Sequence, residues 1–367
     1  MNEMVELTNE QRAVVETTKS KVVVIATAAA GKTRCITERV RWLLKQGIDP
    51  KKIVAITFTN AAAEEISDRL GNPPNLFVGT IHSLANYYLR SGGIDTSKVL
   101  NEEKFDELFK IIKEHPECIH EVEHLIVDES QDSNALQFEF LLDMIKPKNY
   151  MLCGDHRQAI YRFAGAYPDY LINLVNDNPE VTTYDLTQNY RNAPNILEYA
   201  KALIKPLGSE YKDKSIPMRN STEGRVVNVD YSASGIATTI QRYVDQKKCD
   251  YRDWFVLTRT NAELDEIYEV LKSCKIPCDT FKKANLDNKG LKGKMEENTV
   301  KVLTIHTAKG LEAKNVIVIG ARFRDTEERC ISYVAATRAK DLLVWTIKRA
   351  KRAYRPKSYG PNTTSWE

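Results

Sequence analysis

Gly31, Lys32 and Thr33 stand between an apolar run at 21–26 and an amphipathic stretch that continues to about Lys45. A triplet of this kind ends the phosphate-binding loop signature G-x-x-x-x-G-K-[ST]. In that loop the backbone N–H groups and the following helix cradle a phosphate, the lysine reaches the β- and γ-phosphates, and the threonine hydroxyl ligates Mg²⁺. The alternative is a G-K-T that only begins a helix, but the strand-loop-helix setting favours a nucleotide site.

The loop before this triplet is rich in alanine rather than glycine, and its first glycine position is Ala26. We still expect the loop to bind ATP, because a following helix N-terminus and backbone N–H groups do not depend on every glycine. The expected ATP-binding segment comprises Ala26, Thr27, Ala28, Ala29, Ala30, Gly31, Lys32, Thr33 and Arg34.

Two acids, Asp128 and Glu129, follow a second apolar run at 124–127. At the end of a strand, one carboxylate can hold Mg²⁺ while the other orients or deprotonates the attacking water. Acids after a strand are a weak signal alone, but they gain weight beside a G-K-T. We therefore expect Lys32, Asp128 and Glu129 to be catalytic, and Thr33 and Asp128 to bind Mg²⁺.

Parallel sheets covered by helices are the elements that would position these residues. Short apolar runs alternate with amphipathic helical stretches, which indicates an α/β fold. There are too many runs for one small sheet, so we predict two domains in tandem, 1–180 and 181–347. The expected strands lie near 21–26, 52–59, 123–130, 149–155, 181–186, 224–229, 253–260, 299–305, 314–320 and 341–346.

Other elements are predicted from local signals. A helix should run from Lys32 to about Lys45 and end near Gly47, and Asn60 should cap a second helix. Residues 84–122 lack strong strand patterns and predict a short helical insertion in the first domain. Residues 275–298 are polar and lysine-rich, and predict a loop in the second.

The composition is ordinary for a globular protein, with 42% hydrophobic and 28% charged residues in 367. No apolar run approaches the roughly 20 residues of a membrane helix, and the polar, acidic start does not resemble a secretory signal. The seven scattered cysteines fit reduced thiols. We expect a cytoplasmic protein without a membrane partner.

The net charge of +3 is unevenly distributed. Residues 348–367 carry six Lys or Arg against Glu367, which leaves 47 basic and 49 acidic residues in the rest of the chain. This tail is expected to be disordered. Two interpretations remain open: the tail binds nucleic acid, or it is a solvated chain end.

Eight segments resemble, in order, motifs of the UvrD/Rep family of superfamily 1 DNA helicases. In the first half they are LTNEQRAVV, AITFTNAAAEEI, GTIHSLA, VDESQDSNALQ and CGDHRQAIYRFAGA. In the second half LTQNYRNAPNI is similar to L-x-x-N-Y-R-S, VKVLTIHTAKGLEAKNVIVIG to T-x-H-x-A-K-G-L-E, and EERCISYVAATRAKDLLVW to E-E-R-R-L-x-Y-V-A-x-T-R-A. The resemblance runs from about residue 7 to 346. It implies two RecA-like P-loop domains with ATP hydrolysed in the cleft between them.

The resemblance also implies roles for single residues. Gln11 would contact adenine, Glu312 the ribose, and Gln158 the γ-phosphate, linking it to DNA. Arg191 and Arg338 would reach the γ-phosphate from the second domain, so that the catalytic set is Lys32, Asp128, Glu129, Gln158, Arg191 and Arg338. The implied DNA-binding set is Phe58, Thr59, Asn60, Thr80, His82, Tyr161, Phe163, Thr304 and His306.

For two of these residues an interpretation without a DNA contact is also open. An aromatic ring at Phe163 would stack on a base, at about 1–3 kcal/mol per base, whereas the alternative is packing in the core. His82, without the family frame, would be an ordinary surface histidine.

Several positions depart from the family pattern. The family loop commonly reads A-G-x-G-S-G-K-T, so Ala26 is usual and the losses are at Thr27 and Ala29, where an alanine at positive φ costs roughly 1–2 kcal/mol. Ala61 replaces a lysine, and Phe163 and Ala164 replace tryptophan and arginine. The large helical domain of bigger members is reduced to the loop at 275–298.

The resulting hypothesis is an ATP-dependent DNA helicase or translocase, acting as a monomer with ATP and Mg²⁺ on single-stranded DNA and duplex junctions. The resemblance implies 3′→5′ movement and links the chain to DNA replication and repair without choosing a pathway. One alternative is a translocase that displaces proteins with little unwinding. Another is a non-catalytic DNA-binding scaffold with a degenerate loop.

Close cysteine and histidine residues raise a separate zinc hypothesis. His115, Cys118, His120 and His124 lie within ten residues, but the spacing fits no common zinc finger. We favour an acidic helical surface there, and likewise no metal at Cys274 and Cys278.

Overall fold

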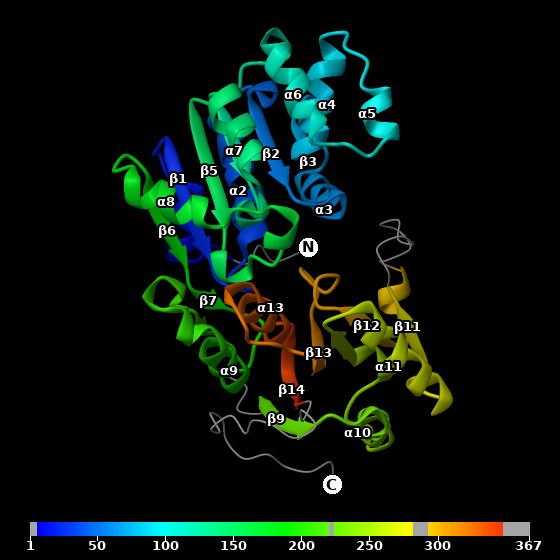
Figure 1. Cartoon of the computed structure of the whole chain (residues 1–367). Coiled ribbons are helices and arrows are strands. Elements are labelled where there is room, and N and C mark those ends of the chain that lie inside the picture. The colour runs from blue at the N-terminus through cyan, green and yellow to red at the C-terminus, as the bar shows by residue number, and fades with distance from the viewer. Residues whose placement is uncertain (1–5, 220–223, 282–292, 348–367) are drawn as a thin grey trace. The chain divides into compact units, whose positions relative to one another are not determined.

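Figure 1 shows the computed structural model of the chain, which describes residues 6–219, 224–281 and 293–347. The chain divides into two compact units, Met1–Gln188 and Asn189–Glu367, and each unit contains a six-stranded sheet. No helix in the described part of the chain is long and apolar enough to cross a membrane.

The first unit is built on a wholly parallel sheet in the order β3-β2-β4-β5-β1-β6. Its strands are β1 Lys21–Ala26, β2 Ile53–Thr57, β3 Phe77–Thr80, β4 His124–Val127, β5 Asn149–Gly154 and β6 Thr182–Leu186. Its helices are α1 Asn9–Val15, α2 Lys32–Lys45, α3 Asn60–Leu70, α4 Ile81–Ser91, α5 Ser97–Asn101, α6 Glu107–Glu114, α7 Ala135–Phe138 and α8 Asp169–Asp177.

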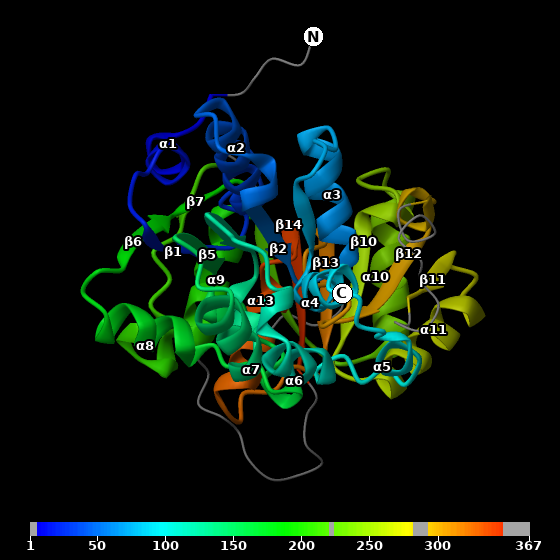
Figure 2. The same ribbon diagram turned by 90° about the horizontal axis from the view of Figure 1, so that it is seen from above.

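Helices cover both faces of this sheet, as its apolar strands require. Val22 and Val24 of β1 point to the face covered by α1, α2 and α3. Val23 points to the opposite face, where α4, α6, α7 and α8 pack. Figure 2 shows the same helices from above.

The second unit also has a wholly parallel sheet, in the order β11-β12-β10-β13-β14-β9. Its strands are β9 Arg225–Asp230, β10 Trp254–Thr258, β11 Cys278–Thr280, β12 Val300–Thr304, β13 Ala313–Ile319 and β14 Ala339–Ile347. Its helices are α9 Pro194–Ile204, α10 Ala233–Asp245, α11 Asn261–Ser273 and α13 Thr326–Ala336. A small sheet pairs β7 Gln188–Asn189 with β8 Ile216–Pro217.

The fold class predicted from the sequence is confirmed, and each expected strand is present. The region 84–122 is helical, as expected, with α4, α5 and α6. Four short strands were missed, β3, β7, β8 and β11, because two to four residues give little apolar pattern. The predicted loop at 275–298 is therefore wrong at Cys278–Thr280, while 282–292 lie outside the described residues.

Two predicted boundaries shift. β6 pairs with β1, so Thr182–Leu186 belongs to the first unit rather than to the second domain predicted to begin at 181. The helix cap also moves by one residue. Thr59, not Asn60, caps α3, because its Oγ1 accepts a hydrogen bond from the N–H of Ala62.

Candidate functional site

The G-K-T triplet lies at the carboxyl end of β1, where the loop enters α2. Gly31 precedes the helix with φ +80°, and a Cβ there would lie 2.7 Å from Gln11 Nε2. The positive φ favours glycine at this position, and a Cβ there would also require the end of the Gln11 side chain to move. Ala29, in the loop before Gly31, has a positive φ of +59°. Thr27 has no positive φ, and its hydroxyl donates a hydrogen bond to the carbonyl of Leu186 at 3.0 Å.

Gln11 is buried against this loop. Its Nε2 donates to the carbonyl of Ala30 at 3.2 Å, and its Oε1 accepts the N–H of Thr8 at 3.2 Å in the capping box of α1. The side-chain amide thus joins α1 to the phosphate-binding loop.

Lys32 lies between the two acids at the end of β4. Its Nζ is 2.8 Å from Asp128 Oδ1 and 2.5 Å from Glu129 Oε1. Burial alone would lower the pKa of Lys32, but the two carboxylates raise it above its ordinary value. Burial is also the main reason that the pKa of Asp128 is raised, against the opposing effect of Lys32. The lysine is therefore held charged, with its ammonium beside the two carboxylates.

The residues around Lys32 fit a Mg²⁺ ion bound with a nucleotide. Thr33 offers a hydroxyl from the first turn of α2, and Asp128 offers a carboxylate from the end of β4. Oxygen donors of this kind, together with substrate phosphates, are what Mg²⁺ prefers. Arg34 lies half-buried in the same helical turn.

A buried chain of hydrogen bonds leads from Glu129 to Gln158. Gln131 donates to Glu129 Oε2 at 2.5 Å and accepts the N–H of Asp155 at 3.0 Å. Asp155 in turn accepts from Gln158 Nε2 at 2.8 Å and from Arg157 Nε at 2.6 Å. Sequence reasoning missed Gln131, Asp155 and Arg157, although all three lie inside the quoted motif segments.

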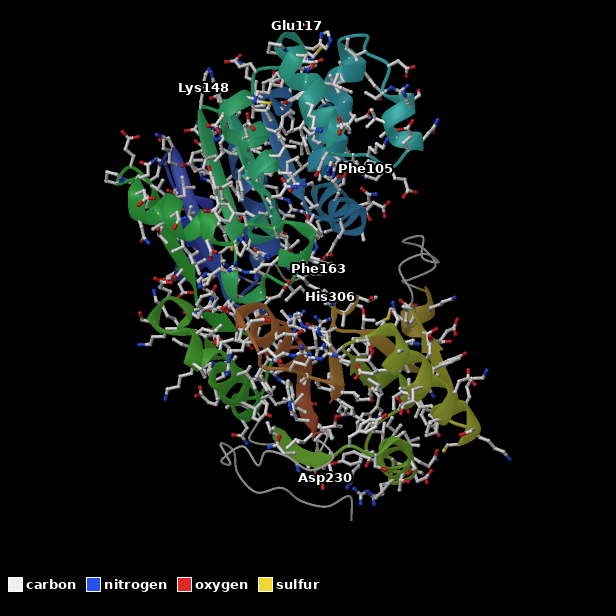
Figure 3. All side chains as sticks on the ribbon, viewed as in Figure 1. Phe105, Glu117, Lys148, Phe163, Asp230 and His306 are labelled. Atoms are coloured by element: carbon white, nitrogen blue, oxygen red, sulfur yellow. The ribbon has the colours of Figure 1, made fainter. Side chains whose placement is uncertain are left out.

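Phe58, after β2, and Tyr161 and Phe163, after Gln158, form a row of aromatic rings. The rings of Phe58 and Tyr161 stack at 5.1 Å and 26°, and Tyr161 lies 6.1 Å from Phe163. Phe163, labelled in Figure 3, is 69% exposed, so the core-packing alternative for it is wrong. Burial raises the pKa of Tyr161, and the nearby Asp132 adds to that effect.

The other expected DNA contacts of the first unit have different environments. Thr59 and Asn60 are exposed at the start of α3. Thr80 caps α4 and bonds Ser83 in a capping box. His82 is 3.0 Å from Asp106 through its Nε2 and packs on the ring of Phe109.

In the second unit, the structure brings Arg191 and Glu312 together. Arg191 Nε lies 2.5 Å from Glu312 Oε2, and Lys340 Nζ lies 2.6 Å from Glu312 Oε1. Burial alone would raise the pKa of Glu312, yet the two cations lower it to about 2. The residue expected at the ribose is thus, in this structure, the counter-ion of an expected catalytic arginine.

Arg338 is buried and lies two residues before Lys340 in the chain. It is 2% exposed and donates to the carbonyls of Val334 at 3.0 Å and Leu311 at 3.2 Å. Arg191 Nη1 reaches the carbonyl of Thr337 at 3.3 Å, so the two arginines adjoin the same stretch of backbone.

Thr304 is the last residue of β12, and His306 lies two residues after it. Thr304 Oγ1 is 2.9 Å from Thr307 Oγ1 and accepts the N–H of Thr307. His306 is half-buried and labelled in Figure 3.

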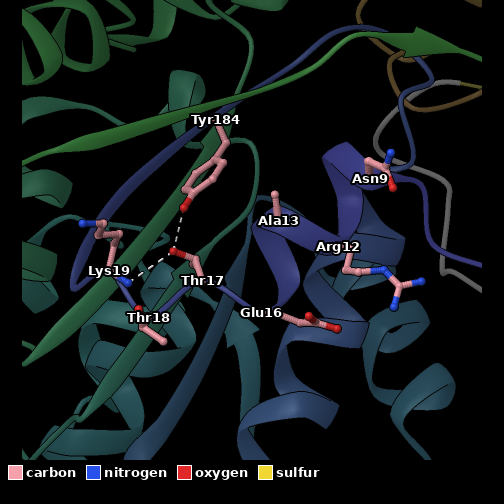
Figure 4. A pocket seen from close by; sticks show the side chains of 8 residues that line it. All are labelled: Asn9, Arg12, Ala13, Glu16, Thr17, Thr18, Lys19 and Tyr184. Carbon is pink, nitrogen blue, oxygen red and sulfur yellow. Dashed lines mark hydrogen bonds between the residues drawn. The ribbon is translucent and has the colours of Figure 1, made fainter.

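Two other features lie apart from the loop. A hollow of about 460 Å³ is lined by α1, the segment after it and Tyr184, with none of the loop residues (Figure 4). Within the described residues no group of three His, Cys, Asp or Glu side chains is arranged to hold a metal ion, which gives the zinc hypothesis no support.

Both units match models of a single family. The UvrD/REP helicase N-terminal domain matches residues 7–118 and 104–179, and the UvrD-like helicase C-terminal domain matches 184–286 and 279–350. The chain belongs to the UvrD/REP helicase family.

Similar proteins carry helicase names. An ATP-dependent DNA helicase PcrA of Leuconostoc citreum is 27% identical, over 74% of this chain and 49% of the relative. A PcrA of Staphylococcus epidermidis is 26% identical, over 76% and 51%. A probable DNA helicase of Mycoplasma pneumoniae is 25% identical, over 93% and 83%. This UvrD-family chain thus spans about half the length of the two PcrA relatives.

Proposed function

We propose that this chain is a DNA-stimulated ATPase that moves along single-stranded DNA in the 3′→5′ direction and unwinds duplexes. The observation that carries the proposal is the connected network in the first unit. It joins the ion pairs of Lys32 with Asp128 and Glu129, through Gln131 and Asp155, to the segment that bears Gln158, Tyr161 and the exposed Phe163.

Each group of this network has a chemical role in the proposal. Lys32 exchanges its carboxylate partners for the β- and γ-phosphates of ATP, and Glu129 orients the attacking water. Thr33 and Asp128 would hold a Mg²⁺ ion, which would neutralise charge on the phosphates. Gln158 transmits the phosphate state to the segment bearing Phe163.

The second unit supplies arginines in this proposal. Arg191 leaves Glu312 for the transferring phosphoryl group, because a guanidinium stabilises the charge that spreads over its oxygens. In this proposal ATP binding and ATP hydrolysis drive opposite steps of a hinge transition that a motor can use. Gln11 positions the adenine side of the loop.

Single-stranded DNA binds along Phe58, Tyr161 and Phe163 in this proposal. Stacking on these rings is sequence-tolerant, since every base has a π-face, and contributes about 1–3 kcal/mol per base. Thr304 and His306 contribute the DNA contacts of the second unit, and the phosphate contacts make binding salt-dependent.

ATP turnover with and without single-stranded DNA tests the proposal, beside Lys32→Ala. We expect turnover that DNA stimulates and that the variant abolishes. Absence of turnover in the intact chain, with DNA binding retained, would instead support a non-catalytic scaffold.

Partial duplexes with a 3′ or a 5′ single-stranded tail test unwinding and polarity. We expect strand separation from the 3′ tail only, so unwinding from the 5′ tail alone contradicts the polarity. DNA-stimulated turnover and displacement of a bound protein, without strand separation, would identify a translocase.

A further inference from the structure

Asn192, the residue after Arg191, is completely buried in the loop that precedes α9. Its Nδ2 donates to two backbone carbonyls, Thr337 at 3.1 Å and Ala339 at 2.6 Å. These are the residues on either side of Arg338. The side chain of Asn192, which follows Arg191, is therefore hydrogen-bonded to the backbone on both sides of Arg338.

The orientation of the Asn192 amide follows from its partners. Its Oδ1 accepts from Asn189 Nδ2 at 2.9 Å, and both hydrogens of its Nδ2 face carbonyl oxygens. A flipped amide would place an oxygen against two other oxygens, so only one orientation satisfies the site. Asn189 Oδ1 also accepts the N–H groups of Arg191 at 3.1 Å and Asn192 at 2.8 Å, which fixes the loop itself.

Further hydrogen bonds connect the segment at Arg191 with the segment at Arg338. The N–H of Ala193 donates to the carbonyl of Lys340 at 3.0 Å. Arg219 Nη1 donates to the carbonyls of Arg191 at 2.9 Å and Lys340 at 3.0 Å. The backbone on which both arginines stand is thus cross-linked through side chains.

We propose that Asn192 is a positioning residue that sets Arg191 and Arg338 at a fixed separation, so that both meet the transferring phosphoryl group together. This inference rests on the proposed function, because the role of both arginines at the phosphoryl group belongs to that proposal. Asn192 itself makes no contact with nucleotide in it. Small displacements matter here, since a shift of about 1 Å in a catalytic group can cost about a hundredfold in rate.

The family motif N-Y-R-S has serine where this chain has Asn192. A serine hydroxyl has one hydrogen and a shorter reach, so it can satisfy at most one of the two carbonyls. The variant Asn192→Ser therefore removes at least one of the two hydrogen bonds to these carbonyls, while it introduces the residue that the family motif has at this position.

The test measures kcat and KM for ATP, with saturating single-stranded DNA, in the full chain. We expect Asn192→Ser to lower kcat about tenfold and to change KM for ATP less than about twofold, because the loop around Lys32 is untouched. Asn195→Ser is the matched control. It also removes an amide that donates to a backbone carbonyl, that of Gly224 at 2.7 Å, but it does not touch either arginine segment, and we expect kcat unchanged.

Arg191→Ala and the double variant Arg191→Ala/Asn192→Ser separate positioning from general loosening. If Asn192 acts through the arginine, the second substitution adds little to the loss in kcat caused by the first. Asn189→Asp is a second probe, since it keeps the acceptor for the loop N–H groups but removes the donor that orients Asn192, and it too should lower kcat.

Four outcomes overturn the inference. An unchanged kcat in Asn192→Ser, an equal loss in Asn195→Ser, or a fully additive loss in the double variant each contradicts positioning, while the proposed function stands if Arg191→Ala is impaired. An Arg191→Ala variant with normal turnover removes the proposed arginine role itself, and the inference with it.

Discussion

Ala29 holds a left-handed backbone conformation, φ +59°, inside the phosphate-binding loop. An alanine there is strained by roughly 1–2 kcal/mol relative to a glycine. Thr27, the other position at which the family loop commonly has glycine, has no positive φ and makes a side-chain hydrogen bond to Leu186. The two departures from the family loop are therefore physically different.

Substituting each of the two by glycine should change the free energy of unfolding in different ways. We expect Ala29→Gly to be neutral or stabilising by up to about 1 kcal/mol, because relief of strain offsets the greater chain entropy of glycine. We expect Thr27→Gly to destabilise by about 1–2 kcal/mol, since it loses a buried hydrogen bond and gains that entropy. Urea unfolding measures both, and destabilisation by Ala29→Gly would contradict the strain.

The lowered pKa of Glu312 predicts a pH dependence of stability. Its pKa falls from 4.5 to about 2 in the folded chain, with Arg191 the larger of the two cationic influences. A carboxyl whose pKa is lower in the folded state stabilises the fold above its unfolded pKa, and this contribution disappears as the pH falls from about 4.5 towards 2.

The variant Glu312→Gln should accordingly lose less stability than the natural chain between about pH 5 and pH 3. The free energy of unfolding, measured by urea at both pH values, gives the difference. Glu198→Gln is the control, because Glu198 is exposed on α9 and forms a surface ion pair with Lys201, three residues further along the helix. Equal pH slopes for Glu312→Gln and the natural chain would contradict the ion-pair argument.

At the scale of elements, the carboxyl ends of parallel strands gather the chemistry. β1 leads into the G-K-T loop, β4 into Asp128 and Glu129, and β5 into the segment with Asp155 and Gln158. β4, β5 and β1 are neighbours in the sheet, so residues far apart in sequence meet at one edge. The positions of ligands in open α/β sheets follow the same rule.

The start of α3 offers an element-scale prediction. Thr59 Oγ1 accepts the N–H of Ala62 at 3.2 Å, whereas Asn60 is the first residue of the helix itself. We expect Thr59→Ala to destabilise the chain by about 1 kcal/mol, because one N–H of the first turn loses its acceptor. Asn60→Ala should cost much less. Thermal unfolding of both variants checks this, and the reverse order would restore Asn60 as the cap.

At the scale of the whole molecule, charge is divided between the body and its carboxyl-terminal segment. The first 347 residues carry 47 basic and 49 acidic side chains, while 348–367 carry six basic side chains and one acid. In the proposed function, attraction of the body to nucleic acid therefore depends on local groups such as the aromatic row, and a contribution of the basic segment is a separate hypothesis.

A chain shortened to 1–347 tests that division. If the six basic residues contact phosphates, the slope of log Kobs for single-stranded DNA against log salt should become shallower by up to about 4, at about 0.7 per contact. Fluorescence anisotropy over a salt series measures the slope. An unchanged slope would show that the basic segment is only solvated.

Local sequence patterns predicted the fold class and most of its helices and strands. The G-K-T triplet, the acids after an apolar strand and the alternation of strands and helices all depend on neighbours in the chain, so the α/β fold and the Lys32, Asp128 and Glu129 group could be predicted. Helix α2 agrees with its prediction from Lys32 to Lys45 because its strand and loop flanks are themselves local.

Only the tertiary structure decided how these parts are connected. Local pattern does not predict that β6 pairs with β1, or that Gln131 links Glu129 to Asp155. It also does not predict the hydrogen bonds from Asn192 to the backbone on either side of Arg338. Each depends on distant segments brought together by the sheet, and on which buried donor meets which acceptor once water is excluded.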